Sequence, residues 1–156
     1  MGVSGCGKSS LGAALGERLG IGFIEGDSLH PPANVEKMRS GTPLTDEDRW
    51  PWLDLIAAEL GAHDDLIVSC SALRRVYRDR LRAGGEGVYF VHLAGSREVF
   101  AARMAARNHE YMPLSLLDSQ LATLEAPGDD EAFTLDVTMP LDAMVDSVVD
   151  YLEKQR

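Results

Sequence analysis

The chain has 156 residues, of which 45% are apolar and 26% are charged, so its composition is that of one globular domain and excludes a disordered tail. Its 25 acidic and 15 basic residues give a net charge of −10, which argues against a broad surface that binds nucleic acid. A ligand with negative charge is therefore expected to be small and to be held by a local cluster of arginines. No apolar run approaches the roughly 20 residues that span a membrane, and two cysteines are too few for a disulfide framework, so we expect a cytoplasmic protein with no membrane partner.

Helical and extended patterns alternate along the first half of the chain. Leucines spaced four residues apart predict a helix that begins near Lys8, and Ile21–Glu25 is a candidate for a short strand. The prolines at 31–32 open a helix that runs through Met38. Pro51 suits the first turn of a further helix with an apolar face.

The second half continues the alternation. The predicted elements are a buried strand at 66–68, a polar helix at 74–82, a buried strand at 88–91, a helix that Ser96 caps, a helix at 114–124, an edge strand at 133–137 and a helix at 141–152. Strands that alternate with helices imply an α/β fold with a parallel sheet, and we expect one domain over residues 1–156.

Residues 2–9 match the pattern G-x-x-x-x-G-K-[ST] of a phosphate-binding loop. Its glycines allow successive backbone N–H groups to face phosphate oxygens, and the following helix adds its positive dipole end. Lys8 reaches the β- and γ-phosphates, and the Ser9 hydroxyl ligates Mg²⁺. The nucleotide-binding residues predicted here are Gly2, Ser4, Gly5, Cys6, Gly7, Lys8, Ser9 and Ser10.

Only Met1 stands in front of this loop, which normally follows a buried strand of about five residues. That strand lies in the middle of the sheet in P-loop folds, so its absence leaves unpaired edges on both neighbours. We therefore expect that the first central strand is missing from this chain, which is short at its N-terminus.

The acidic residues narrow the class of nucleotide-binding protein. No [NT]-K-x-D motif of a guanine-reading GTPase is present, and no acidic pair follows the strand at 66–68. The acids instead follow the strand at 21–25, as Glu25 and Asp27. One acid near Mg²⁺ and another aimed at an incoming hydroxyl are typical of a small-molecule kinase.

Several segments closely resemble gluconate kinases (gluconokinases): Gly26–Pro31, Gly41–Leu44, Asp46–Leu53, Cys70–Leu73 and Tyr77–Asp79. The resemblance implies the P-loop kinase fold with strand order 2-3-1-4-5, and the transfer of phosphate from ATP to the 6-hydroxyl of D-gluconate. It also implies Mg²⁺, a homodimer, a substrate-binding helical segment at about 28–60 and a lid at about 107–113. Cys6 departs from the family, which usually has serine there.

Asp27 is predicted to accept or orient the proton of the gluconate 6-hydroxyl, with a turn residue as the alternative. Glu25 is predicted to hold a Mg²⁺-bound water, or else is a solvated acid. By resemblance to kinases of this group, Arg103 stacks on adenine and Arg107 closes on the phosphates. The alternative for these two arginines is an exposed pair one helical turn apart.

The carboxylate of gluconate calls for a bidentate arginine. Arg49 is the first candidate, by resemblance to the arginine that binds the acid group in shikimate kinases, and Arg75 and Arg78 follow. The arginines of the helix at 74–82 otherwise form a solvated face. His30 and Gln120 are candidate donors to sugar hydroxyls, with core or capping roles as alternatives.

Two other functions stay open at this point. One is another small-molecule kinase of the same fold, such as one that acts on shikimate. The other is a nucleotide-binding module without catalysis, because the first strand is missing.

Overall fold

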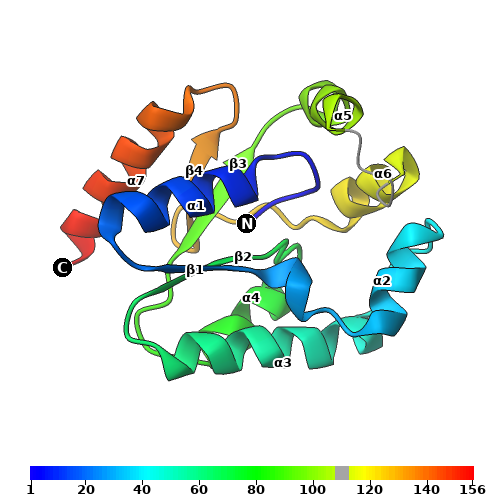
Figure 1. Ribbon diagram of the computed structural model, residues 1–156, viewed down its shortest axis with the longest axis horizontal. Helices are drawn as coiled ribbons and strands as arrows, with labels where there is room; N and C mark the ends of the chain where they lie inside the picture. The colour runs from blue at the N-terminus through cyan, green and yellow to red at the C-terminus, as the bar shows by residue number, and fades with distance from the viewer. Residues whose placement is uncertain (108–112) are drawn as a thin grey trace.

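The computed structural model describes residues 1–107 and 113–156 (Figure 1). Its strands form two parallel pairs. β1 (Gly22–Glu25) pairs with β2 (Leu66–Ser69), and β3 (Phe90–Ala94) pairs with β4 (Ala132–Asp136). With the number 1 kept for the central strand that P-loop folds have, the two pairs take the places 2-3 and 4-5 of the predicted order.

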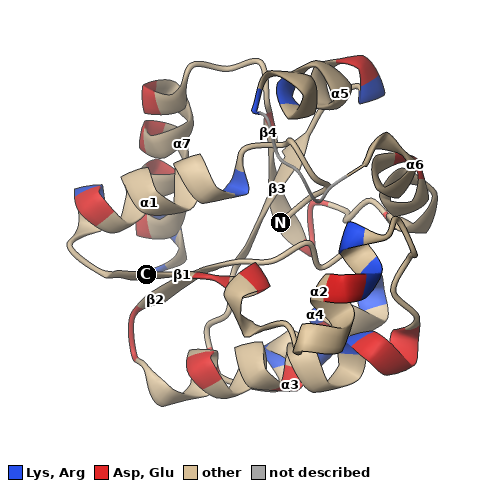
Figure 2. Cartoon of the chain, turned by 45° about the vertical axis from the view of Figure 1, so that its right-hand side comes forward, with Lys and Arg blue, Asp and Glu red and all other residues tan. Residues whose placement is uncertain are grey.

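Helices surround the two strand pairs. They are α1 (Lys8–Leu19), α2 (Pro32–Arg39), α3 (Asp46–Ala62), α4 (Arg75–Arg82), α5 (Arg97–Ala106), α6 (Leu114–Thr123) and α7 (Leu141–Gln155), with a short 3₁₀ helix η1 (Gly26–Leu29). α1 lies against α7 and both strands of the first pair, and α3 packs on α4. Basic residues of α4 lie beside acidic residues of α3 where these helices meet (Figure 2), as in the ion pair between Arg80 and Asp54. The described part of the chain contains no helix long and apolar enough to cross a membrane.

Most predicted elements are present, with two corrections. The prediction that Pro51 lies in a first helical turn is wrong, because α3 already begins at Asp46 and contains Pro51. Thr45 caps this helix in a capping box with Asp48, which satisfies the first backbone N–H groups and starts the helix earlier. The strand predicted at 88–91 begins two residues later, at Phe90, where pairing with β4 starts.

The two strand pairs flank a groove at the N-terminus of the chain. A cavity of about 480 Å³ lies there, lined by β2, by β3 and by apolar side chains that include Leu11, Ile56 and Val148. The amide of Leu93 donates to the carbonyl of Met1 (3.0 Å), and the amide of Gly2 donates to the carbonyl of Ser71 (3.2 Å). The start of the chain thus bonds to β3 and to the segment after β2, as a strand placed between them would.

Candidate active site

The phosphate loop has the backbone shape that its glycines predict. Gly5 and Gly7 have positive φ angles of 80° and 94°, and a Cβ on Gly5 would lie 2.7 Å from the Phe100 carbonyl oxygen. No other residue type fits there without strain. Gly7 is the N-cap of α1, so the loop leads directly into a helix whose first N–H groups favour anions.

The ammonium of Lys8 lies across its own loop. It donates to the carbonyl oxygens of Gly2 (3.0 Å) and Val3 (3.1 Å), and it lies 3.8 Å from the Cys6 sulfur. Cys6 is fully buried, so the sulfur fills the interior of the loop. The positive charge is thereby placed where phosphate oxygens bind in such loops.

Two side chains from later helices hold this loop in place. The side-chain oxygen of Gln120 on α6 accepts a hydrogen bond from the amide of Ser4 (2.7 Å). Arg103 on α5 donates to the carbonyls of Cys6 (3.5 Å) and Val137 (2.5 Å). The structure therefore places both residues at the phosphate loop.

The two acids predicted to act in catalysis follow β1. Glu25 ends this strand and accepts a hydrogen bond from the Ser69 hydroxyl (2.8 Å), which itself accepts one from the amide of Gly26 (3.2 Å). A Cβ on Gly26 would lie 2.0 Å from the Ser69 carbonyl oxygen, so only glycine fits at this point. The chain then turns into η1 and presents Asp27, whose side chain is 57% exposed.

His30 lies next to Asp27 on a rigid base. Its ring stacks on Trp52 with centroids 4.0 Å apart, and the Trp52 indole donates to the Gly26 carbonyl (2.8 Å). The Asn34 side chain contacts the other edge of the ring. Burial lowers the pKa of His30 to about 4, with a smaller lowering contribution from the charge of Arg49 and against the opposing charge of Asp27, so the ring is neutral at pH 7.

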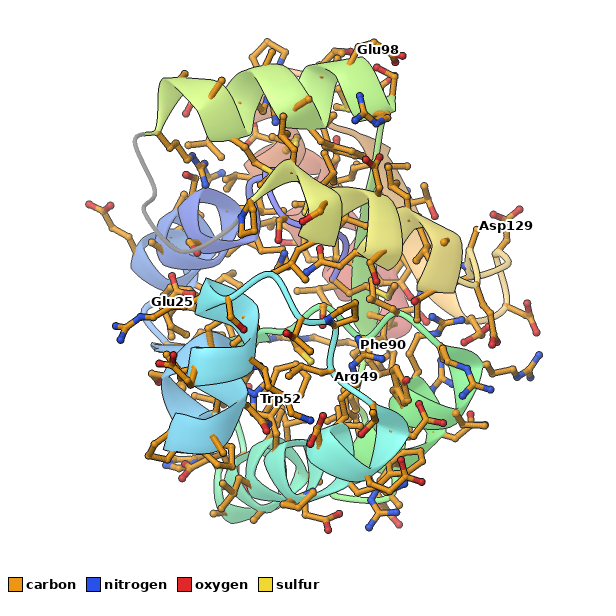
Figure 3. The ribbon with its side chains drawn as sticks, turned by 90° about the vertical axis from the view of Figure 1, so that its right-hand side faces the viewer. Glu25, Arg49, Trp52, Phe90, Glu98 and Asp129 are labelled. Atoms are coloured by element: carbon orange, nitrogen blue, oxygen red, sulfur yellow. The ribbon has the colours of Figure 1, made fainter. Side chains whose placement is uncertain are left out.

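Arg49 is buried near the N-terminal end of α3. Its guanidinium donates to the Tyr77 hydroxyl (2.7 Å), and that hydroxyl donates to Asp46. Hydrogen bonds from Tyr77, and then the charge and hydrogen bond of Arg74, lower the pKa of Asp46. Arg49 and Trp52 rise from α3 on the side of the molecule that α2 and α6 also cover (Figure 3). The chain of contacts orients a permanent positive charge in the cleft.

One cavity joins four of the six predicted substrate-binding residues to the phosphate loop. It has a volume of about 50 Å³, and its lining includes Ser4, Lys8, Asp27, His30, Arg49 and Gln120. Its charged lining residues are two cations, Lys8 and Arg49, and one carboxylate, Asp27, which come from the phosphate-loop end of α1, from α3 and from η1. The cavity can bind an anionic molecule, place an alcohol near Asp27 and present a phosphate at Lys8.

Arg75 and Arg78 are not brought to this cavity. Arg75 is exposed at the first position of α4. Arg78 is only 1% exposed, and its guanidinium donates to the Glu131 carboxylate (2.6 and 3.2 Å) and to the carbonyls of Ala72, Leu73 and Glu125. These five contacts use all five N–H donors of the group, so this arginine stabilises the fold at this position. Ala72 has a positive φ of 45°, which Arg78 helps to hold.

The structure describes the predicted lid only at its two ends, and the lid stays a prediction. Arg107 is exposed as the C-cap residue of α5. Residues 108–112, which make up the rest of the predicted lid before Pro113, lie outside the described residues.

The donor atoms near the loop fit Mg²⁺ bound together with ATP. Ser9 offers a hydroxyl in the first turn of α1, and Glu25 offers a carboxylate at the end of β1. Among the described residues, no three His, Cys, Asp or Glu side chains cluster as a preformed metal site. Mg²⁺ in phosphoryl-transfer sites is held by about one or two protein oxygens, while phosphates and water complete its shell.

Sequence reasoning missed three supporting residues of the site. Asn34, Trp52 and Tyr77 are buried and contact His30 or Arg49. A signal existed for Asn34, which follows His30 by one helical turn. Tyr77 gave no such signal, since its contact with Arg49 joins residues 28 positions apart.

A phosphate loop with its lysine, an acid after the neighbouring strand and a buried arginine in one cavity define a small-molecule kinase of the P-loop class. A family model described as an AAA domain matches residues 1–127. The chain is 52% identical over 135 residues to a gluconokinase of Gluconobacter oxydans (84% of this chain, 76% of the relative) and 39% identical over 160 residues to the thermoresistant gluconokinase of Escherichia coli (99% and 91%). The crystal structure of a gluconokinase from Sinorhizobium meliloti 1021 superposes with a TM-score of 0.87 at 49% identity, over 99% of this chain and 94% of that one. The chain belongs to the gluconokinase family.

Proposed function

We propose that this protein transfers the γ-phosphoryl group of ATP to the 6-hydroxyl of D-gluconate and releases 6-phosphogluconate and ADP. The observation that carries the proposal is the cavity that Lys8, Asp27 and Arg49 line together. It supplies a phosphate contact, a proton acceptor and a carboxylate contact within one small space. Relatives named gluconokinases, one of them 52% identical, support the same activity.

The nucleotide binds at the loop. Backbone N–H groups of residues 4–10 face the phosphates, and Lys8 exchanges its contacts with Gly2 and Val3 for phosphate oxygens. Mg²⁺ bound together with ATP would supply neutralisation of the phosphate charge. Ser9 would hold it directly and Glu25 through a water molecule. Arg103 lies beside the loop, where its planar group is available to stack on adenine, and Arg107 closes on the transferring phosphoryl group.

The sugar acid binds on the opposite side of the cavity, in the helical segment at 28–60. Arg49 pairs with the carboxylate of gluconate, and this contact fixes the far end of the substrate. The 6-hydroxyl then lies near Asp27, which takes its proton as the oxygen attacks the γ-phosphorus. His30 and Gln120 complete the cavity wall. Positioning and electrostatic stabilisation do most of the work in such transfers.

A coupled assay of ADP release tests the proposal. Gluconate, shikimate and nucleoside monophosphates are compared at saturating Mg²⁺ and ATP. We expect turnover with gluconate and none with shikimate or the nucleoside monophosphates. A mass spectrum should identify the product as 6-phosphogluconate. Turnover with shikimate or a nucleoside monophosphate in place of gluconate would reassign the substrate. Binding of ATP with no turnover on any of them would leave a binding module.

The proposed function also bears on the oligomeric state of the protein and on its location in the cell. We infer a homodimer, which sedimentation velocity tests by its mass. We also infer a cytoplasmic enzyme, since ATP is its co-substrate and both cysteines, Cys6 and Cys70, are free thiols. Fractionation of the source cells tests the location.

A further inference from the structure

The imidazole of His30 is fixed on three sides. It stacks on Trp52 at 4.0 Å and 16°, its Nδ1 lies 3.2 Å from the side-chain nitrogen of Asn34, and its Nε2 lies 3.9 Å from Oδ1 of Asp27. The side chain of His30 is only 3% exposed, and Asn34 and Trp52 are buried too. The ring therefore has one orientation, with Nε2 toward the proposed proton acceptor.

The hydrogen bonds of Asn34 determine which ring nitrogen carries the proton. The same nitrogen of Asn34 that contacts His30 also donates to the backbone carbonyl of Asp48 (2.9 Å). A carbonyl oxygen only accepts, so this atom is the amide nitrogen and it donates to Nδ1 of His30 as well. Nδ1 must then be unprotonated, and a neutral ring carries its proton on Nε2.

We propose that His30, held by Asn34 as the Nε2–H tautomer, is a positioning residue that orients the carboxylate of Asp27 for proton transfer. This inference rests on the proposed function, in which Asp27 accepts the proton of the alcohol. One oxygen of Asp27 accepts the Nε2–H bond, and the other faces the 6-hydroxyl. The separation of 3.9 Å shortens when the substrate binds, as catalytic hydrogen bonds often do on leaving the unliganded state.

This role differs from a structural one and from direct contact with the sugar. A residue that only packs against Trp52 affects stability, and one that binds a sugar hydroxyl affects mainly KM. A donor that orients the base affects kcat while KM for ATP and gluconate changes little. The side-chain nitrogen of glutamine can take the position of Nε2, whereas phenylalanine retains only the stacked ring.

The test compares His30→Phe and His30→Gln with the matched control His63→Phe, whose wild-type ring is exposed at the end of α3. We expect kcat to fall by about 10- to 100-fold in His30→Phe, since one hydrogen bond to an ionised group is lost. We expect His30→Gln to regain a substantial part of that loss and His63→Phe to match the wild type. Melting curves and ATP affinity show that each variant is folded.

Three kinetic outcomes would overturn the proposal. They are a kcat of His30→Phe within two-fold (~0.4 kcal/mol) of the wild type, an equal loss of kcat in both His30 variants, or a change confined to KM for gluconate. A ¹H–¹⁵N correlation spectrum of the histidine rings gives a readout that needs no turnover. Protonated Nε2 on His30 supports the proposal, and protonated Nδ1 overturns it. If the spectrum shows the expected tautomer but the wild-type protein does not phosphorylate gluconate, the proposed function is overturned, and the positioning role falls with it. Turnover with the opposite tautomer overturns the positioning role alone.

Discussion

The guanidinium of Arg49 donates a hydrogen bond to the hydroxyl of Tyr77 over 2.7 Å, and this contact ties the cleft to helix α4. Tyr77 in turn donates to Asp46, at the start of α3. The arginine thus has one edge fixed by protein, and its other N–H groups are oriented by that contact. A substrate carboxylate meets a donor that is already in place.

Arg49→Lys is expected to raise KM for gluconate about 10- to 100-fold, because a lysine keeps the charge and loses the bidentate fork. KM for ATP should stay within two-fold (~0.4 kcal/mol) of the wild type. Steady-state kinetics with each substrate varied in turn gives both values. Arg75→Lys on the exposed start of α4 is the matched control and should change neither. Equal effects of the two variants would contradict the assignment of Arg49.

Asp27→Asn is expected to lower kcat by about 100- to 10,000-fold, since an amide cannot accept the proton of the alcohol. Binding of ATP, measured by calorimetry, should persist because the phosphate loop is unchanged. Asp129→Asn, at an exposed loop position distant from the site in Figure 3, controls for the loss of one negative charge. Near-normal turnover of Asp27→Asn would remove this residue from the mechanism.

Arg78→Met is expected to destabilise the folded chain by about 3–5 kcal/mol, because the buried Glu131 carboxylate loses its hydrogen-bonded partner and keeps only Arg82 at 3.9 Å. For a chain of this size that lowers Tm by about 10 °C. Arg80→Met is the matched control, since Arg80 lies on the exposed face of α4 and pairs there with Asp54 of α3. Thermal melts of both variants should show a far larger shift for Arg78. A similar shift in the two would mean that burial of the ion pair is unimportant.

Acid is expected to destabilise the fold partly through His92 on β3. Burial, and then the charges of the Met1 amine and Arg78, lower its pKa from 6.5 to about 4. The unfolded chain binds this proton below about pH 6.5 and the folded chain only near pH 4, so stability falls as pH falls through that window. Urea unfolding from pH 7 to pH 4 should show a shallower decline in His92→Gln than in the wild type, with the exposed His63→Gln as the control. Parallel curves for His92→Gln and the wild type would refute this account.

An apolar segment joined to Met1 is expected to stabilise the protein by filling the groove between β2 and β3. Five residues such as valine and isoleucine match the length of a typical strand of about five to six residues. They would pair with the edges of β2 and β3 that face the groove and fill the cavity of about 480 Å³. A glycine–serine segment of equal length is the control and should leave Tm near that of the unextended chain. Equal Tm values for the two extensions would show that the groove does not accept a strand.

The parts of the fold that depend on neighbours in sequence could be predicted. The leucine spacing gave α1, Ser96 gave the cap of α5, and the glycine pattern gave the phosphate loop. The start of α3 was predicted wrongly from Pro51, because a proline suits the first turn of a helix. The helix in fact begins at Asp46, where Thr45 and Asp48, three residues apart, form the capping box. That capping box was a local signal too, but it competed with the stronger preference of proline.

The parts that depend on distant contacts could not be predicted. The arginines of α4 look alike in sequence, yet Arg78 is buried against Glu131 and Arg80 is exposed. Helical spacing gave one hint, since Arg78 lies next to Tyr77 and three residues before Leu81, on the buried face. The support of Arg49 by Tyr77 and the pairing of Met1 with β3 join residues far apart in the chain, so only the folded structure shows them.

Because the Lys8 ammonium rests on two backbone carbonyls of its own loop, the arrival of a nucleotide replaces one set of oxygens by another. An ammonium that already donates to two protein oxygens is already aligned, so we expect little rearrangement when a nucleotide binds. A triphosphate, with its several negative charges, competes well with the two neutral carbonyl groups for the Lys8 ammonium. A monophosphate competes poorly. We therefore expect this contact of Lys8 to favour a triphosphate over a monophosphate at the loop.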